Sequence, residues 1–168
     1  MPRFKLFEVT GKFLISMVAV VVIQGILAYK FRVFAYFDLP LVCTVYYGFT
    51  LGNPMASILM GSSLGLMQDS LSAAVLGTNG FSKTLIGFLA ASAVSRFAVD
   101  QPITRIFALF LFTLADGLLV TMLALMVGPV SNATYGGALS VWLLSATFNT
   151  LLGLIWFGYH DRLGNATT

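Results

Sequence analysis

The stretch from Ser57 to Gly80, SILMGSSLGLMQDSLSAAVLGTNG, places one acidic residue, Asp69, inside a long apolar run. A second run, from Ile106 to Val127 (IFALFLFTLADGLLVTMLALMV), surrounds Asp116 in the same way. An ionised side chain at the centre of a bilayer costs at least about 2.5–3.5 kcal/mol on insertion scales, so such residues face protein rather than lipid. These two carboxylates are therefore the first candidates for a functional or structural site.

The composition is that of an integral membrane protein. Of the 168 residues, 58% are hydrophobic and only 9% are charged, whereas a soluble domain carries about 25% charged residues. The nine Lys and Arg residues are spread along the chain, which indicates membrane topology rather than binding of nucleic acid. The single cysteine, Cys43, excludes an internal disulfide. We expect one membrane domain over residues 1–168, with no cofactor.

Hydropathy and helix-breaking residues divide the chain into six predicted membrane-spanning helices. They cover about residues 13–29, 39–51, 54–71, 81–97, 102–127 and 138–159. In the second helix, Asp38 is placed to cap the N-terminus and Pro40 suits the first turn. This helix is short, so the aromatic segment 31–37 is expected to lie at the membrane interface, and the sequence GTNG at 77–80 predicts a turn. The predicted fold is an all-α bundle of six transmembrane helices.

Lysines and arginines predict the orientation, because they are more frequent in cytoplasmic segments. With both termini inside, the cytoplasmic segments hold Arg3, Lys5, Lys12, Arg96, Arg105 and Arg162. The outer segments hold Lys30, Arg32 and Lys83. This six-to-three distribution favours cytoplasmic N- and C-termini.

Small residues recur along the third predicted helix. Ser57, Gly61 and Gly65 are spaced four residues apart and lead to Asp69. Small residues at this spacing allow two helix backbones to approach closely in a membrane. The stripe therefore predicts a tight helix crossing around the Asp69 carboxylate.

Each buried carboxylate needs hydrogen-bond donors. For Asp69 the candidate donors are Lys83, Asn79 and nearby serine or threonine side chains. For Asp116 the candidate partners are Asn149, Thr147 and Gln24. Three roles stay open for Asp69 and Asp116: structural hydrogen bonding, a role with a ligand or proton, and contact with a partner protein. If the acids are structural acceptors, replacement by asparagine should be tolerated better than replacement by leucine.

The sequence lacks the motifs of known membrane or soluble enzymes. The only histidine, His160, lies near the C-terminus, away from the predicted spans' interiors. No zinc-protease, serine-hydrolase or phosphate-binding loop motif is present in the sequence. We therefore expect a protein without catalytic activity.

The segment from Phe37 to Leu89 resembles the rod shape-determining protein MreD family. The matching residues are Pro40, Gly52, Gly61, Gly65, Leu66, Asp69 and Gly77. The order Asp-Leu-Pro at 38–40 departs from the Pro-Asp-Leu of the family pattern. Asp116 and Asn149 also stand where that family often carries an acid and an asparagine. Chain length and the six predicted spans agree with the family over nearly the whole sequence.

The resemblance implies a non-enzymatic component of the cell-elongation machinery in the bacterial inner membrane. It implies binding to MreC and, through MreC, work with RodA, a class B penicillin-binding protein and MreB in peptidoglycan synthesis. Membrane lipid is a further expected contact, nucleic acid is not, and self-association stays open.

The main alternative is the substrate-binding subunit of an energy-coupling-factor vitamin transporter, which is also small and six-helical. Such subunits often carry an Ala-x-x-x-Ala pair on the first helix, but here Ala19 is followed four residues later by Ile23. They also need a polar pocket that opens outward. We expect the shape-determining role rather than transport.

Overall fold

A computed structural model describes residues 3–72, 76–94, 101–127 and 138–165 of the chain. Over these residues the protein is all-helical, which confirms the predicted class. The elements are α1 (Arg3–Lys30), the 3₁₀-helix η1 (Arg32–Tyr36), α2 (Leu39–Leu51), α3 (Pro54–Ser72), α4 (Thr78–Val94), α5 (Pro102–Val127) and α6 (Ala138–Asn165).

The helix ends agree closely with the predicted ones for α2, α3 and α5, where proline and glycine mark the boundaries. Helix α4 begins at Thr78 rather than near residue 81, because the predicted turn is confined to Leu76 and Gly77 and the rest of GTNG belongs to the first turn of the helix. Its predicted end at residue 97 lies outside the described residues. Helices α1 and α6 extend beyond their predicted apolar spans to Arg3 and Asn165.

Among the residues that the structure describes, three segments are long and apolar enough to cross a membrane. They are Val33–Leu51, Ile103–Met126 and Leu139–Gly158. Helix α4 has 17 residues and spans about 26 Å at 1.5 Å per residue. Helix α3 has 19 residues but carries several serines and glycines that lower its mean hydropathy.

Local capping explains how the central helices begin and end. The Asp38 carboxylate accepts a hydrogen bond from the Leu41 backbone N–H at 2.9 Å and caps α2 as predicted. Gly52 ends α2 in the left-handed conformation, with a φ of +56° that favours glycine. The Asn53 side chain then accepts from the Met55 backbone N–H at 3.0 Å and caps α3. The short link between α2 and α3 is thus built from residues that terminate one helix and start the next.

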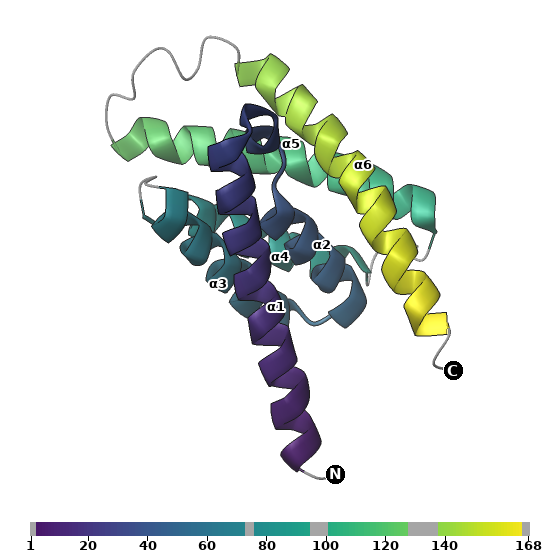
Figure 1. Ribbon diagram of the computed structural model, residues 1–168. Coiled ribbons are helices and arrows are strands. Elements are labelled where there is room, and N and C mark those ends of the chain that lie inside the picture. Colours follow the sequence, from purple (N-terminus) through teal and green to yellow (C-terminus); the bar gives the residue numbers. More distant parts are fainter. Residues whose placement is uncertain (1–2, 73–75, 95–100, 128–137, 166–168) are drawn as a thin grey trace.

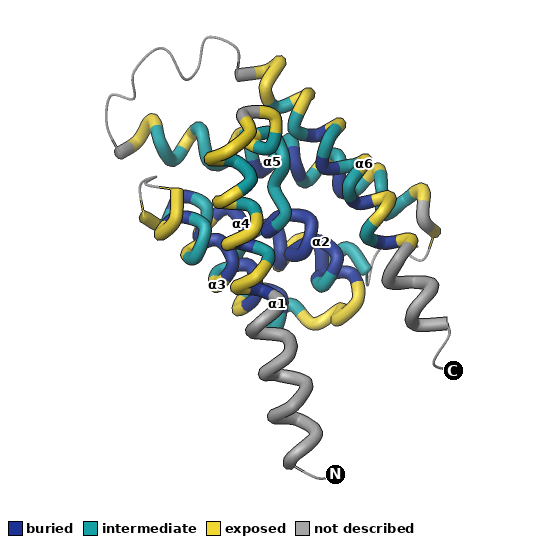
Figure 2. The backbone as a smooth tube through the Cα atoms, in the orientation of Figure 1, coloured by how far each residue is buried: buried dark blue, intermediate teal, exposed yellow. Residues whose placement is uncertain are grey.

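Helices α2, α3 and α4 form the centre of the molecule, with α1 crossing in front and α5 and α6 packed beside them (Figure 1). The most extensive contact is between α3 and α4. Figure 2 shows that the buried residues gather on these central helices, whereas α1, α5 and α6 each keep an exposed side. The main apolar cluster comprises Leu41, Val42, Val45, Tyr46, Phe49, Ile86, Ala90, Leu109 and Phe157. Cys43 is buried in a second cluster with Met17, Val21, Met60 and Leu64.

Candidate functional site

The glycine stripe of α3 packs directly against the backbone of α4. A Cβ atom added at Gly61 would overlap the Lys83 carbonyl group, and one added at Gly65 would overlap the Asn79 carbonyl group. Both glycines are buried. The predicted close approach therefore occurs between α3 and α4, and it brings the acid that follows the stripe up to the start of α4.

Asp69 caps α4 from the neighbouring helix. Its Oδ2 accepts hydrogen bonds from the backbone N–H groups of Gly77 at 2.8 Å and Gly80 at 3.0 Å. Its Oδ1 accepts from the backbone and side-chain nitrogens of Asn79 at 3.1 and 2.8 Å, and from the Thr78 hydroxyl at 3.4 Å. The first N–H groups of a helix lack intrahelical partners and carry partial positive charge, so a carboxylate there is well stabilised. Asp69 thus ties α3 to α4.

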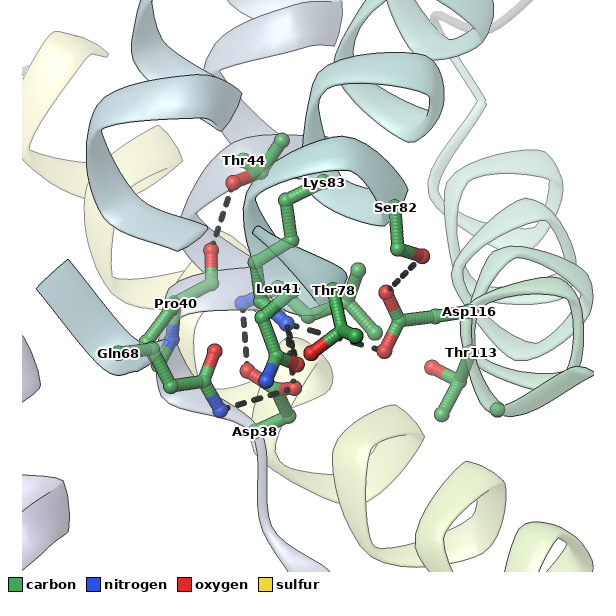
Figure 3. A network of polar contacts seen from close by, with 12 residues as sticks. Asp38, Pro40, Leu41, Thr44, Gln68, Thr78, Ser82, Lys83, Thr113 and Asp116 are labelled. Carbon is green, nitrogen blue, oxygen red and sulfur yellow. Dashed lines mark hydrogen bonds and ion pairs between the residues drawn. The ribbon is translucent and has the colours of Figure 1, made fainter. Parts of the chain in front are cut away.

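Lys83 is the centre of a second polar group and is completely buried. Its Nζ lies 2.8 Å from Asp38 Oδ2 and 3.7 Å from Asp116 Oδ2 (Figure 3). It also donates to Asn79 Oδ1 at 3.3 Å. The lysine on α4 therefore connects the start of α2 with the middle of α5.

Asp116 has a neutral donor in addition to the lysine. The Ser82 hydroxyl donates to Asp116 Oδ1 at 2.6 Å. Asp116 is buried, so leaving its charge without partners would cost several kcal/mol. Ser82 and Lys83 are adjacent on α4, and together they hold α5 against that helix.

Asp38 collects contacts from three further helices. Its backbone N–H donates to Asn149 Oδ1 on α6 at 2.8 Å. Gln68 Nε2 on α3 makes a long contact of 3.5 Å with Asp38 Oδ2. Gln24 on α1 holds the chain on both sides of Asp38, donating to the Phe37 carbonyl at 2.9 Å and accepting from the Leu39 N–H at 2.7 Å. Every α-helix therefore contributes a polar group to the surroundings of Asp38. We call the following set of residues the polar core: Gln24, Asp38, Gln68, Ser82, Lys83, Asp116 and Asn149.

A small cavity lies inside the polar core. It has a volume of about 130 Å³ and is lined by Asp38, Gln68, Asp116 and Asn149, among others. Two buried atoms, the acceptor Gln68 Oε1 and the donor Asn149 Nδ2, have no hydrogen-bond partner. The described part of the chain holds no group of three or more His, Cys, Asp or Glu residues suited to a metal ion. The carboxylates of Asp38 and Asp116 and the two unpartnered polar atoms therefore offer negative charge and hydrogen bonds to a molecule in the cavity.

The predicted site residues fall into two groups. Gly61, Gly65, Asp69 and Gly77 lie together where α3 meets the start of α4. Pro40, Asp116 and Asn149 belong to the second region: Asp116 and Asn149 line the cavity, and Pro40 is buried in the first turn of α2 next to Asp38.

Of the predicted donors to Asp69, Asn79 and a threonine, Thr78, are confirmed, but several other predicted pairings were wrong. Lys83 contacts Asp38 and Asp116, so its ammonium group is not the donor to Asp69. Of the partners expected for Asp116, Asn149 and Gln24 bind the backbone around Asp38, and the Thr147 hydroxyl donates to the Leu143 carbonyl. Asp116 is instead met by the Ser82 hydroxyl and the Lys83 ammonium group, both from α4.

Sequence reasoning missed the importance of three residues. The sequence predicts only a helix cap for Asp38, a topology marker or a donor to Asp69 for Lys83, and no role for Gln68. The available signal was the lysine itself, because Lys83 stands in the apolar run FSKTLIGFLAA and an intramembrane cation requires an anion nearby.

Comparison with known proteins identifies one family. The sequence model of rod shape-determining protein MreD matches residues 6–162 of the chain. No curated protein and no solved structure matches the chain.

Proposed function

Because the chain belongs to the rod shape-determining protein MreD family, we propose that it is a non-enzymatic scaffold that binds MreC in the bacterial inner membrane. Membership of the family indicates that the chain is a membrane protein with a role in rod shape determination. The family match over residues 6–162 is the observation that carries the proposal. Through MreC, the scaffold would position RodA, a class B penicillin-binding protein and MreB for peptidoglycan synthesis.

The polar core supports a structural role for the buried charges. The carboxylates of Asp38, Asp69 and Asp116 all have internal donors, and those donors come from other helices or helix ends. Charged groups that are paired within the bundle hold its helices in fixed positions. A rigid bundle of this kind is suited to presenting its outer faces to another membrane protein.

Exposed apolar side chains provide the surfaces for such a partner. Ile23 on α1, Phe107 on α5 and Ile155 on α6 each expose more than half of their surface. In a membrane these faces contact lipid or the helices of other proteins. We propose that MreC binds one of these three faces through its membrane helix.

We also propose that all six helices cross the membrane, with both termini in the cytoplasm. The distribution of lysine and arginine supports this orientation. In Figure 1, the start of α1 and the end of α6 lie toward the same end of the bundle, as an even number of crossings requires.

The volume of the polar cavity taken alone, without the groove that adjoins it at Gln24 and Gln68, favours the scaffold over the vitamin-transporter alternative. Pockets for small molecules usually occupy about 300–1,000 Å³, whereas this cavity has about 130 Å³. A whole vitamin would therefore not fit within the polar cavity, which has room only for a small polar group.

Photocrosslinking in cells tests the proposal. A photoreactive amino acid is placed singly at Ile23, Phe107 or Ile155, and at the fully buried Ile86 as a control. We expect crosslinks to MreC from at least one exposed position, none from Ile86, and co-purification of MreC with the tagged protein. The proposal would be contradicted if none of the three positions crosslinks to MreC and MreC does not co-purify, while the variants still restore rod shape in depleted cells.

A further inference from the structure

An apolar groove runs between α1 and α3. One part has a volume of about 300 Å³ and includes Val21, Gly25 and Leu71 in its walls. An adjoining cleft of about 260 Å³ shares Val21 and Leu71 and extends the groove toward Val18 and Met67. Gly25 leaves open space in the groove, since a Cβ atom added there would meet nothing within 4 Å. The cleft toward Val18 and Met67 is almost wholly apolar, as a site for a hydrocarbon chain requires, whereas Gln24 and Gln68 make the larger part of the groove more polar.

This groove leads to the polar cavity. Gln24 and Gln68 line both the 300 Å³ part of the groove and the cavity beside Asp38 and Asp116. An amphipathic molecule could therefore place its chain between α1 and α3 and its polar end beyond the two glutamines. Gln68 Oε1 is the unpartnered acceptor at this junction.

The charges and hydrogen-bonding groups of the cavity define the polar end that fits. Asp38 and Asp116 share one ammonium group, that of Lys83, so with these groups ionised the cluster carries an excess negative charge. A primary ammonium group supplies one positive charge and three N–H donors. Its donors suit Gln68 Oε1 and the carboxylates, while a phosphate or ester oxygen behind it can accept from Asn149 Nδ2.

We propose that the groove and the cavity together bind one phospholipid with a primary-ammonium head group, of the phosphatidylethanolamine type. One of its two acyl chains lies between α1 and α3 and the other stays in the surrounding bilayer, while the ammonium group enters past Gln24 and Gln68 to face Asp38 and Asp116. An anionic head group would be repelled by the carboxylates, and a trimethylammonium group has no N–H to donate. This site does not depend on the binding of MreC.

Native mass spectrometry of the purified full chain with defined dioleoyl lipids tests the proposal. The protein is mixed with equal amounts of phosphatidylethanolamine, phosphatidylcholine and phosphatidylglycerol. One hydrogen bond to a charged group corresponds to about tenfold in affinity. We therefore expect one tightly retained phosphatidylethanolamine, bound about tenfold more strongly than either competitor.

Two glycines offer a matched pair of variants. Gly25→Leu fills the groove, whereas Gly158→Leu makes the same change on α6, and at neither position does an added Cβ atom meet another atom within 4 Å. We expect Gly25→Leu to lose the bound lipid and Gly158→Leu to retain it. Gln68→Leu should retain a lipid but lose the preference for the primary ammonium group.

Three results would overturn the proposal. They are equal retention of the three lipids by the unaltered chain, unchanged lipid binding in Gly25→Leu, and equal loss in both glycine variants. A dimer that disappears only in Gly25→Leu would assign the groove to a second copy of the chain instead. Ethylamine, a soluble amine without an acyl chain, is added as a competitor. If ethylamine does not displace the bound phosphatidylethanolamine, and Gly25→Leu but not Gly158→Leu abolishes binding, the ligand is the lipid rather than a free amine.

Discussion

Lys83 makes ion-pair contacts with two carboxylates, those of Asp38 and Asp116. It is fully buried, and its ammonium group is the cation that both Asp38 and Asp116 contact. Removal of one partner from a buried ion pair costs about 3–5 kcal/mol, because the other charge is left without compensation. The residue is therefore central to stability even if the ion pair itself contributes little relative to an apolar pair.

We predict that Lys83→Met lowers the stability of the bundle by about 3–5 kcal/mol. The measurement is the melting temperature in detergent, followed by fluorescence-detected size exclusion. Lys30→Met, at an exposed lysine, is the control and should behave like the unaltered protein. The double variant Lys83→Met/Asp116→Asn should recover part of the loss, since it removes one of the two stranded carboxylates. A melting temperature for Lys83→Met equal to that of Lys30→Met would disprove the role of the ion pairs.

The two buried acids should differ in their response to asparagine, a distinction that the sequence alone did not predict. Both oxygens of Asp69 accept backbone N–H groups, so the amide nitrogen introduced by Asp69→Asn would point its own N–H bonds at other donors. Asp116 instead receives a rotatable serine hydroxyl and a lysine at 3.7 Å. We predict that Asp69→Asn costs about 2–3 kcal/mol and Asp116→Asn about 1 kcal/mol or less.

The same melting experiment, together with rod shape in depleted cells, measures this difference. Replacement by leucine at either position should be worse than replacement by asparagine, because donors would remain unpaired in a low-dielectric interior. If Asp116→Asn folds normally and binds MreC but does not restore rod shape, the charge itself has a function that the scaffold proposal does not include.

At the scale of elements, the contact between α3 and α4 decides how the bundle is assembled. The two helices meet through glycines on α3 and carbonyl groups on α4, so backbone atoms rather than flexible side chains set their separation. Asp69 then joins the end of α3 to the first turn of α4. The close packing and the cap depend on each other, because the carboxylate reaches the N–H groups only when the helices are in contact.

We predict that even Gly65→Ala disrupts this contact. The added methyl group would overlap the Asn79 carbonyl group, which cannot move without shifting α4. Overpacking of this kind costs about 1–3 kcal/mol and sometimes more. Gly158→Ala is the matched control, since its new methyl group would meet no atom within 4 Å. Accumulation in membranes and melting temperature are measured, and equal values for the two variants would exclude the close packing.

At the scale of the whole molecule, the six helices are joined by a polar core near the start of α2 rather than by apolar contacts alone. Gln24, Lys83 and Asn149 reach this region from α1, α4 and α6. In a membrane, hydrogen bonds between helices give specificity that apolar packing cannot, because lipid offers similar apolar contacts.

The proposed topology predicts which positions react with a membrane-impermeant thiol reagent. In a background with Cys43→Ala, Leu76→Cys between α3 and α4 should react in intact spheroplasts. Leu51→Cys at the end of α2 should react only after permeabilisation, because it lies at the cytoplasmic end. Both side chains are exposed in the structure, so burial does not limit labelling. The opposite pattern would invert the orientation, and equal labelling of both would reduce the number of crossings.

From the amino-acid sequence we could predict the all-helical class of the protein, most helix boundaries and one half of the candidate site. Its apolar composition indicates helices in a membrane, and the boundary signals at Asp38, Gly52 and Pro102 act within a few residues. The link between the glycine stripe and Asp69 was also predictable, since both lie on α3 and the family resemblance rests on the same residues. These features are local, so the order of residues is sufficient to indicate them.

Which charges pair depends on how the helices pack in three dimensions. Asp38 and Lys83 are 45 positions apart, and Asp38 and Asn149 are 111 apart. In a soluble helix the alternation of polar and apolar faces would show which side points inward, but here both the lipid-facing and the core-facing sides are apolar. The packing of six helices, rather than any periodicity, brings Asp38, Lys83 and Asp116 together, because each buried charge must find its partner across a helix interface.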